Sequence, residues 1–280
     1  MTNDAITRQR QQWRRAAAGW KKWAEVFAQR DDAQRYLEAG DVGRGQKILE
    51  VGAGTGDQTL VLAERVGPEG SVLAIDLSEN MVEIAKERVE AAGFDNVTFE
   101  VADANTLEID DGSFDVAVSG FTWMLLDQPE HAAARVAKLL TPGGRFVASV
   151  WGPPPQAPLV SAPMKVIVDE LEIEPPTGPG PGLFALADPD HFRSILENAG
   201  FVDVLVQPFQ FAMTFDSPSD YAEFTRDVAV VISDLVEEHA PERSDEIWAK
   251  VADSVEPDAN PDGSVTLNNT GLLAVGSAPS

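Results

Sequence analysis

The stretch LEVGAGTGDQ, residues 49–58, places three glycines within five positions directly after an apolar run. Glycine loses more backbone entropy on folding than any other residue, and it fills no space. Such a cluster predicts either a tight turn or a ligand that approaches the backbone more closely than a Cβ atom would permit. The segments on either side, and the rest of the chain, decide between these readings.

The glycines join a predicted strand to a predicted helix. KILEVG (47–52) is apolar and short, as a buried strand is, whereas DQTLVLAERV (57–66) has helical periodicity. The loop therefore follows the carboxyl end of a strand, where open α/β sheets bind ligands. The helix that begins there favours polar or anionic groups at its amino end.

The spacing of the glycines narrows the class of ligand. A dinucleotide fingerprint requires G-x-G-x-x-G, but Gly52, Gly54 and Gly56 form G-x-G-x-G, and Asp57 takes the place of the third glycine. A carboxylate at that place is unfavourable for a pyrophosphate, which disfavours a nicotinamide dehydrogenase. No G-K-[ST] follows, so the loop is not a P-loop. The spacing favours a nucleoside without a pyrophosphate.

Strands and helices alternate at short spacing along the rest of the chain. This alternation predicts a parallel sheet with helices on both faces. The predicted strands after the first are 71–77, 96–103, 113–120, 145–151, 202–215 (long or kinked) and 264–278. The second predicted helix begins after Ser78, its N-cap, and ends at Gly93. Further helices are predicted over 129–140, about 161–172, 188–201 and much of 217–255.

Charge is the unusual feature of the composition. The net charge is −25, although residues 1–47 carry a charge of +4. So acidic a body repels phosphate backbones, which argues against a nucleic-acid partner. The acidity either keeps the protein soluble or adapts it to high salt, where charges are screened.

Several classes of protein are disfavoured by what the sequence lacks. The chain has no cysteine, so disulfides, thiolate nucleophiles and cysteine-ligated metals are excluded. No apolar run approaches the roughly 20 residues that cross a bilayer, and the N-terminus has no apolar signal core. We therefore expect a cytoplasmic protein without a membrane span.

Carboxylates end the second and third predicted strands. Asp76 is placed to accept hydrogen bonds from a ribose diol, and Asp103 is within reach of the exocyclic amine of a base. Either one alone is more often a helix cap or a loop residue. Together with the glycine loop, in this order along the sheet, they predict a nucleoside site.

At this point the sequence resembles the class I S-adenosylmethionine-dependent methyltransferases. The matching stretches are ILEVGAGTGD, VLAIDLSENMVEIAKER, VADANTLEIDDGSFDVAVSG and RVAKLLTPGGRFVASVW. Within that family the chain is most similar to the small-molecule branch that includes the ubiquinone/menaquinone-biosynthesis C-methyltransferases. The resemblance implies a Rossmann-like, doubly wound α/β fold. Its seven-stranded sheet is mostly parallel with an antiparallel last strand, and helical cap elements are added to it.

The resemblance also implies a set of residues that bind S-adenosylmethionine and its product S-adenosylhomocysteine. The glycines would let the backbone pass under the methionine and ribose parts, and Glu50 would contact the amino group. Asp76 would hold the ribose, while Asp103 would meet the edge of the adenine. The full set is Glu50, Gly52, Ala53, Gly54, Gly56, Asp76, Leu77, Met81, Asp103, Ala104, Ser119 and Phe121.

Methyl transfer from a sulfonium needs alignment more than acid–base chemistry. A base is required only if the acceptor must lose a proton. Of the three histidines, His131 alone is predicted near the carboxyl ends of central strands and is the candidate base. The histidines are too scattered along the chain to predict a metal site.

Tryptophan is frequent, with six residues in the chain. Trp13, Trp20 and Trp23 share one face of a predicted N-terminal helix, which either packs on the body or forms a lid over the cofactor. Trp123 and Trp151 follow the fourth and fifth predicted strands. For these two, lining an acceptor pocket and core packing are equally compatible with the sequence.

These observations predict four segments. They are an N-terminal helical lid (1–40), a Rossmann-like core that binds S-adenosylmethionine (41–216), a helical cap insertion (217–258) and a C-terminal strand that completes the sheet (259–280). The insertion has an apolar face that either packs on the flank of the sheet or forms a cap over the site; we favour the cap. Its predicted apolar face is Tyr221, Phe224, Val228, Val231 and Leu235.

The predicted function is methyl transfer from S-adenosylmethionine to a small, partly apolar metabolite. Two alternatives use the same pocket: a relative that catalyses a non-methyl reaction such as cyclisation, and a non-catalytic module that binds S-adenosylmethionine. The sequence does not identify the acceptor, the atom methylated or the oligomeric state.

Overall fold

The computed structural model describes residues 3–174 and 180–280. Its centre is a seven-stranded sheet in the order β3-β2-β1-β4-β5-β7-β6. All neighbouring strands are parallel except β7, which runs antiparallel to both β5 and β6. The predicted fold, including the antiparallel last strand, is confirmed. The strands are β1 (Lys47–Val51), β2 (Ser71–Asp76), β3 (Val97–Val101), β4 (Phe114–Gly120), β5 (Leu140–Trp151), β6 (Val202–Phe215) and β7 (Val265–Ser277).

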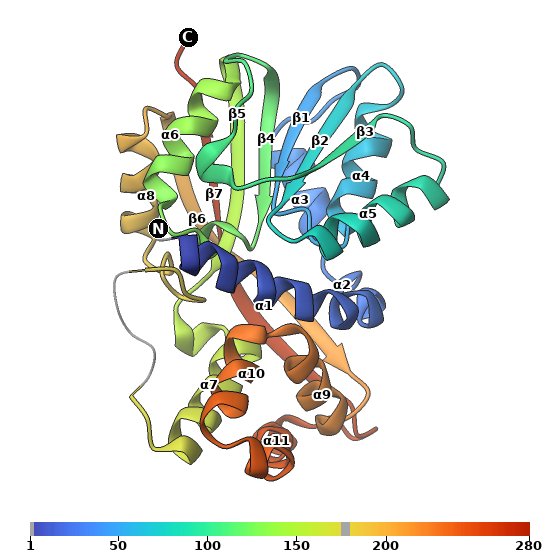
Figure 1. Ribbon diagram of the computed structural model, residues 1–280, viewed down its shortest axis with the longest axis vertical. Coiled ribbons are helices and arrows are strands. Elements are labelled where there is room, and N and C mark those ends of the chain that lie inside the picture. The colour runs from blue at the N-terminus through green and yellow to red at the C-terminus, as the bar shows by residue number, and fades with distance from the viewer. Residues whose placement is uncertain (1–2, 175–179) are drawn as a thin grey trace.

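Helices cover both faces of the sheet, as Figure 1 shows. α3 (Asp32–Ala39), α4 (Asp57–Val66) and α5 (Glu79–Ala91) form one layer, in which neighbours contact each other. α6 (Pro129–Leu139) and α8 (Pro189–Asn198) form a second layer against β5, β6 and β7. This is the doubly wound arrangement that alternating strands and helices produce.

The helix boundaries follow the sequence signals for capping. Ser78 accepts a hydrogen bond from the backbone N–H of Met81 at the start of α5, and Asp188 accepts from two N–H groups at the start of α8. Ser217 caps the start of α9 (Pro218–Val228) in the same way. In each case a side-chain oxygen satisfies backbone donors that have no partner inside the helix.

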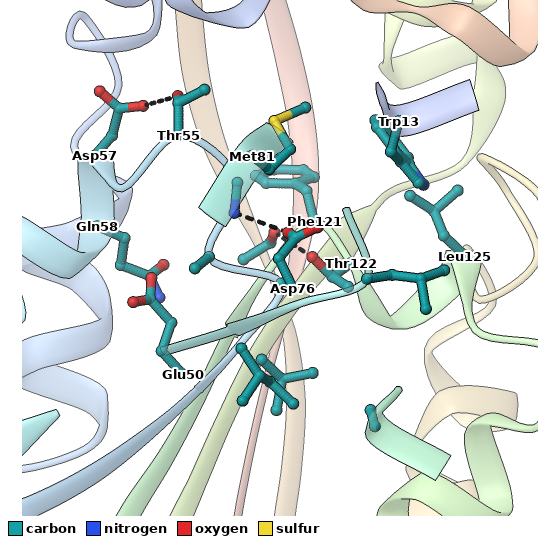
Figure 2. A pocket seen from close by; sticks show the side chains of 18 of the residues that line it. Trp13, Glu50, Thr55, Asp57, Gln58, Asp76, Met81, Phe121, Thr122 and Leu125 are labelled. Carbon is teal, nitrogen blue, oxygen red and sulfur yellow. Dashed lines mark hydrogen bonds between the residues drawn. The ribbon is translucent and has the colours of Figure 1, made fainter. Parts of the chain in front are cut away.

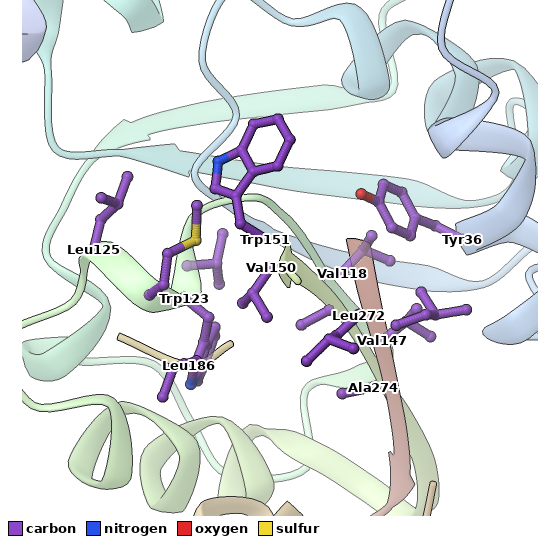
Figure 3. Packing of buried hydrophobic residues seen from close by; sticks show 14 of the residues in the cluster. Tyr36, Val118, Trp123, Leu125, Val147, Val150, Trp151, Leu186, Leu272 and Ala274 are labelled. Atoms are coloured by element: carbon purple, nitrogen blue, oxygen red, sulfur yellow. The ribbon is translucent and has the colours of Figure 1, made fainter. Parts of the chain in front are cut away.

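The core lies between the sheet and its helices, and Figure 3 shows part of it. Apolar residues of the central strands, such as Val118, Val147 and Ala274, are fully buried. Trp123 is also fully buried and packs edge-on against Phe146, with ring centroids 4.9 Å apart. The near-continuous apolar character of these strands reflects burial of the sheet on both faces.

A second group of helices lies beyond the carboxyl ends of the strands. In Figure 1, β6 and β7 extend out of the sheet toward this group. It comprises α7 (Pro158–Leu171), α9, α10 (Val230–His239) and α11 (Ser244–Asp253). Helix α1 (Asn3–Lys22) lies across the space between this group and the sheet, and α2 (Ala24–Phe27) connects it to α3.

Three details differ from the sequence expectation. β5 begins at Leu140 rather than at residue 145, because the TPGG turn joins the sheet. α7 begins at Pro158 and contains Pro163, which cannot donate to the carbonyl of Leu159; the Tyr221 hydroxyl donates to that oxygen instead, at 3.1 Å. The helical segment after residue 217 breaks at Ala229, so α9 and α10 have separate apolar faces.

The break at Ala229 changes which residues of the insertion are buried. Tyr221, Phe224 and Val228 on α9 are buried, as predicted. On α10, Val231 and Leu235 are only partly buried, and the buried face consists of Val230, Ile232 and Val236. The predicted single face is therefore wrong for α10, since the chain changes direction between the two helices.

Candidate functional site

A cavity of about 350 Å³ opens at the carboxyl ends of β1, β2, β3 and β4. Residues of α1, α2 and α3 close its other side, and Figure 2 shows a close view of its lining. Three kinds of element thus meet at this cavity: the carboxyl ends of the strands, the amino ends of α4 and α5, and the N-terminal helices. This is the edge at which an open α/β sheet binds its ligands.

All three glycines of the first loop adopt left-handed backbone angles, with φ of 79° at Gly52, 55° at Gly54 and 85° at Gly56. A Cβ atom at Gly52 would lie 2.1 Å from the Thr122 hydroxyl oxygen, and one at Gly56 would lie 2.9 Å from the Ala85 Cβ. A Cβ at Gly54 would meet no atom within 4 Å. Gly52 and Gly56 therefore serve chain packing, whereas Gly54 leaves open space at the cavity.

Asp76, the last residue of β2, is fixed by backbone donors. Its Oδ2 accepts from the N–H of Gly54 at 2.9 Å, and its Oδ1 accepts from the N–H of Ser78 at 2.8 Å. Burial raises the pKa of this carboxyl, and the hydrogen bonds from Ser78 and Gly54 oppose the rise. Each oxygen retains acceptor capacity toward the cavity, because a carboxylate oxygen accepts more than one hydrogen bond.

Glu50 on β1 is 1% exposed and contributes to the cavity lining. Its Oε2 accepts from the Thr59 hydroxyl at 2.6 Å, while Oε1 has no hydrogen-bond partner among the described residues. Burial raises the pKa of this carboxyl to about 8, the Thr59 hydrogen bond lowers it, and the nearby charge of Asp76 raises it. Glu50 is thus a buried acid with one unpaired oxygen at the cavity.

The end of β3 forms another part of the lining. Asp103 caps a short 3₁₀ turn, Ala104–Thr106, since its Oδ1 accepts from both the backbone N–H and the side-chain amide of Asn105. Ala104, Leu77 and the buried Met81 lie along the same region. Asp103 therefore both caps this short turn and lines the cavity.

The residues after β4 bring aromatic surface to the cavity. The backbone of Phe121 has a φ of 50°, which is uncommon for a residue other than glycine and especially for one with a bulky side chain. Its N–H donates to the Ser149 carbonyl at 3.0 Å and to the Ser149 hydroxyl at 3.2 Å. The Ser149 hydroxyl is in turn 2.5 Å from the hydroxyl of the buried Tyr36. These bonds hold the strained residue in place beside Thr122.

Most of the residues assigned to the cofactor by resemblance do line the cavity. The ten are Glu50, Gly52, Ala53, Gly54, Asp76, Leu77, Met81, Asp103, Ala104 and Phe121. Gly56 and Ser119 are not in the lining. Gly56 contacts α5, and the Ser119 hydroxyl is buried and donates to the Val51 carbonyl at 2.9 Å.

The predicted tryptophans fall into two groups. Trp13 and Trp20 line the cavity, whereas Trp23 lies outside it and donates to Asp227 on α9 at 2.8 Å. Trp123 lies in the core, and Trp151 packs on Phe121 with ring centroids 4.7 Å apart. His131, the candidate base, is exposed on α6 and does not belong to the cavity lining.

Sequence reasoning missed part of the lining. Arg30, Asp32 and Tyr36, before and within α3, face the cavity, as do Gln9 on α1 and Gln58 on α4. Residues 29–37, QRDDAQRYL, are too polar to suggest a buried position. Only the folding of the N-terminal segment back over the strand ends brings them to the site.

Comparison with known proteins places this arrangement in a family. The methyltransferase-domain family matches residues 43–200, more than half of the chain. The chain belongs to this family. The matched region contains the glycine loop, Asp76, Asp103 and the residues after β4, which are the elements that build the cavity floor.

Curated relatives match a little under half of this methyltransferase-family chain. Demethylmenaquinone methyltransferase of Symbiobacterium thermophilum is 34% identical over 133 residues, which are 47% of this chain and 49% of the relative. The Staphylococcus aureus enzyme of the same name is 40% identical over 116 residues, 41% of this chain and 46% of the relative. The chain thus spans about half the length of the curated relatives it matches.

Solved structures share the fold over a larger part of the chain. A putative methyltransferase from Bacillus halodurans is 17% identical, with a TM-score of 0.59 over 90% of this chain and 100% of that one. A putative methyltransferase from Haloferax volcanii, solved with the activator Trm112, is 21% identical with a TM-score of 0.57, over 97% of each chain. At these identities the likeness shows the fold alone.

Proposed function

We propose that this protein is an S-adenosylmethionine-dependent methyltransferase that acts on a small, partly apolar metabolite. The observation that carries the proposal is Asp76, whose two oxygens are fixed by the backbone of the glycine loop and of the α5 start. A carboxylate at the end of β2, beside a glycine with open space above it, suits a ribose diol. The family to which the chain belongs supports the same reading.

The other cavity residues fit the remaining parts of this cofactor. Met81 and Leu77 offer apolar contact for a base, and Glu50 offers an unpaired oxygen for the amino group. Phe121 and the N-terminal tryptophans supply aromatic faces, which attract cations. When bound, S-adenosylmethionine supplies an activated methyl group on sulfur.

The protein itself then has mainly to align and enclose the reactants. Phe121 and Thr122 line the cavity at the end of β4 and would flank the reacting groups, and helix α1 would shield the cavity from water. No side chain of the described cavity lining is a histidine or a lysine. Any proton that an acceptor loses would go to a carboxylate of the lining or to water.

We infer that residues 1–40 act as a lid and that residues 217–258 support it. Trp20 of α1 stacks on Phe27 at 4.3 Å and donates through its ring N–H to the Val228 carbonyl of α9 at 3.2 Å. The described lining includes no residue of 217–258. The insertion would therefore influence the acceptor through the position of α1.

The net charge of the protein bears on the class of molecule that it methylates and on its compartment. An acidic protein with a net charge of −25 repels nucleic acid, and we propose a small molecule as the acceptor and the cytoplasm as the compartment. Within the described residues no helix is long and apolar enough to cross a membrane. The high net negative charge also fits adaptation to high salt.

Product analysis tests this proposal. The purified protein is incubated with S-adenosylmethionine and a panel of quinones, phenols and amines, and S-adenosylhomocysteine is measured by mass spectrometry. We expect S-adenosylhomocysteine to form with at least one acceptor, together with an acceptor mass increased by one methylene unit. Binding without S-adenosylhomocysteine would favour a binding module, and an altered acceptor without a methyl group would favour a non-methyl reaction.

A further inference from the structure

Positive charge is concentrated on the outer face of α1. Residues 6–22 contain six arginines and lysines and no aspartate or glutamate, in a chain whose net charge is −25. All six of these side chains are exposed, and none of them lines the cavity. The proposed reaction therefore leaves them without a role. They are Arg8, Arg10, Arg14, Arg15, Lys21 and Lys22.

The six cations form two rows along the helix. One row repeats every seven residues, which is nearly two turns, and consists of Arg8, Arg15 and Lys22. The other has spacings of four and seven residues and consists of Arg10, Arg14 and Lys21. The exposed residues between the rows are the uncharged Thr7, Gln11 and Ala18. The outer face of α1 is thus a surface about 30 Å long with cations along both edges.

Half of these cations attach α1 to the rest of the protein. Arg15 pairs with Asp234 on α10 at 2.5 Å, and Lys22 pairs with Asp227 on α9 at 2.7 Å. Lys21 lies 3.3 Å from a carboxylate of α5. Attraction between a basic helix and its acidic neighbours explains these three side chains.

The other three cations have no such explanation. Arg8, Arg10 and Arg14 form no ion pair or hydrogen bond within the part of the chain that the structure describes. Arg10 and Arg14 are four residues apart, a spacing at which like charges repel and destabilise a helix. Uncharged side chains would serve equally well for packing at these exposed positions. Three unpaired arginines on one surface of an acidic protein therefore indicate an anionic partner.

The shape of this surface and its place over the cavity favour a lipid bilayer as that partner. A helix with cations along both edges and no exposed large apolar side chain matches the phosphates of an anionic membrane surface. The same helix roofs the cavity, and Trp13 and Trp20 on its inner face belong to the lining. An apolar acceptor dissolved in lipid would then leave the bilayer beside the cavity rather than cross water.

The acidic body of the protein does not prevent this contact. Charges more than about 8 Å from the bilayer are largely screened at physiological ionic strength. In Figure 1, α1 lies across the near side of the molecule, so its outer face can meet a surface before the other faces do. The carboxylates that contact α1 are already paired with its cations, as Asp227 and Asp234 are.

We propose that the outer face of α1 docks the protein on membranes that carry anionic lipids. The contact is electrostatic and peripheral, and it turns the lid of the cavity toward the lipid surface. Arg8, Arg10 and Arg14 supply the free charges that the lipid phosphates neutralise. Docking itself requires neither cofactor nor acceptor, so it does not depend on the proposed function.

Cosedimentation with sucrose-loaded vesicles tests this proposal. The wild-type protein is mixed, at about 0.1 M KCl, with vesicles of phosphatidylcholine alone or of phosphatidylcholine with phosphatidylglycerol. We expect it to sediment with the anionic vesicles, to stay in solution with the neutral ones, and to be released by molar KCl. The triple variant Arg8→Gln/Arg10→Gln/Arg14→Gln should bind the anionic vesicles about 100-fold more weakly, since each charge contributes about fivefold.

The matched control removes three lysines from other elements. Lys47 on β1, Lys138 on α6 and Lys165 on α7 are exposed, so their replacement by glutamine changes the net charge equally. We expect this control to bind the anionic vesicles within about threefold of the wild type. Thermal melts show whether each variant is folded. If the triple variant of α1 does not fold, Arg10→Gln and Arg14→Gln replace it as single variants, each expected to bind about fivefold more weakly.

Each other result overturns the proposal. Equal binding to neutral and anionic vesicles would show a contact that does not depend on these charges, and so would equal losses in the α1 variant and the lysine control. A wild-type protein that ignores anionic vesicles but binds a short DNA duplex through the same arginines would assign the surface to nucleic acid. Calorimetry with S-adenosylmethionine is run on the same samples. A protein that binds this cofactor but no vesicles contradicts docking alone, whereas one that binds vesicles but no cofactor contradicts the proposed function alone.

Discussion

At the residue scale, Gly54 carries the argument for a ligand. A Cβ atom at Gly52 would clash with Thr122, and one at Gly56 would clash with Ala85. Packing around a tight turn therefore accounts for both of these glycines without a ligand. Gly54 has open space where its side chain would be, and its N–H binds Asp76. Only this glycine separates a ligand site from a tight turn.

Alanine substitutions at Gly54 and Gly52 should affect different properties. The first should mainly weaken cofactor binding, and the second should mainly lower the stability of the fold. Gly54→Ala incurs only the left-handed backbone penalty, about 1 kcal/mol of unfolding free energy, but its methyl group enters the cavity and should weaken S-adenosylmethionine binding at least tenfold. Gly52→Ala adds a clash with Thr122 and should cost about 2–4 kcal/mol. Urea unfolding and calorimetry measure both quantities; a Gly54→Ala protein with wild-type affinity would favour the turn.

Glu50 should make stability depend on pH. Its pKa is raised from 4.5 to about 8 in the folded protein, so its contribution is fully present below pH 4.5 and is lost as the pH rises toward 8. Glu50→Gln removes this dependence. The unfolding free energy of the variant relative to wild type should therefore increase with pH across this window, by up to about 1.4 kcal/mol per unit. A difference that stays constant between pH 5 and 8 would contradict the burial of an acid there.

The residues of the site divide by how they could be predicted. Asp76, Asp103 and the glycine loop were predictable because each lies at or just after the end of a strand, and parallel strands end at one edge. Arg30 and Asp32 were not, because nothing local distinguishes them from an exposed charged connector. Their position depends on how the N-terminal helices return to the sheet, which is a matter of packing between distant segments.

At the element scale, α1 is the structural link between the two groups of helices. A Cβ at Gly19 would lie 2.4 Å from the Asp227 carbonyl of α9, so this glycine permits close helix contact. Lys22 forms ion pairs with Glu223 and Asp227 at 2.7 Å beside it. The alternation of strands and helices in the core followed from local periodicity, but this crossing of α1 over the site depends on contacts more than 200 residues apart in the chain.

Substitution of Gly19 distinguishes helix propensity from docking. Gly19→Ala raises the intrinsic helix stability of α1 by about 1 kcal/mol, yet it should separate α1 from α9 and speed dissociation of S-adenosylmethionine severalfold. Ala18→Gly lowers propensity by a similar amount at an exposed position and should leave the dissociation rate near that of wild type. Stopped-flow displacement measures the rates, and a slower dissociation from Gly19→Ala would rule out the lid.

At the scale of the whole molecule, net charge dominates. A charge of −25 on 280 residues produces repulsion that salt relieves, since the Debye length falls to about 3 Å near 1 M. We expect the Tm to rise markedly between low salt and molar KCl. Differential scanning calorimetry across this range measures it, and a flat profile would favour solubility over adaptation to salt as the reason for the acidity.

The measurement that tests the central claim most directly is a calorimetric titration with S-adenosylmethionine on the wild type and on Asp76→Ala. We predict saturable binding to one site per wild-type chain. The variant should remain folded and bind more weakly by about 1.5–3 kcal/mol, because it loses charge-assisted hydrogen bonds to the ribose. No binding to the wild type, or an equal dissociation constant in a folded Asp76→Ala protein, would contradict the account.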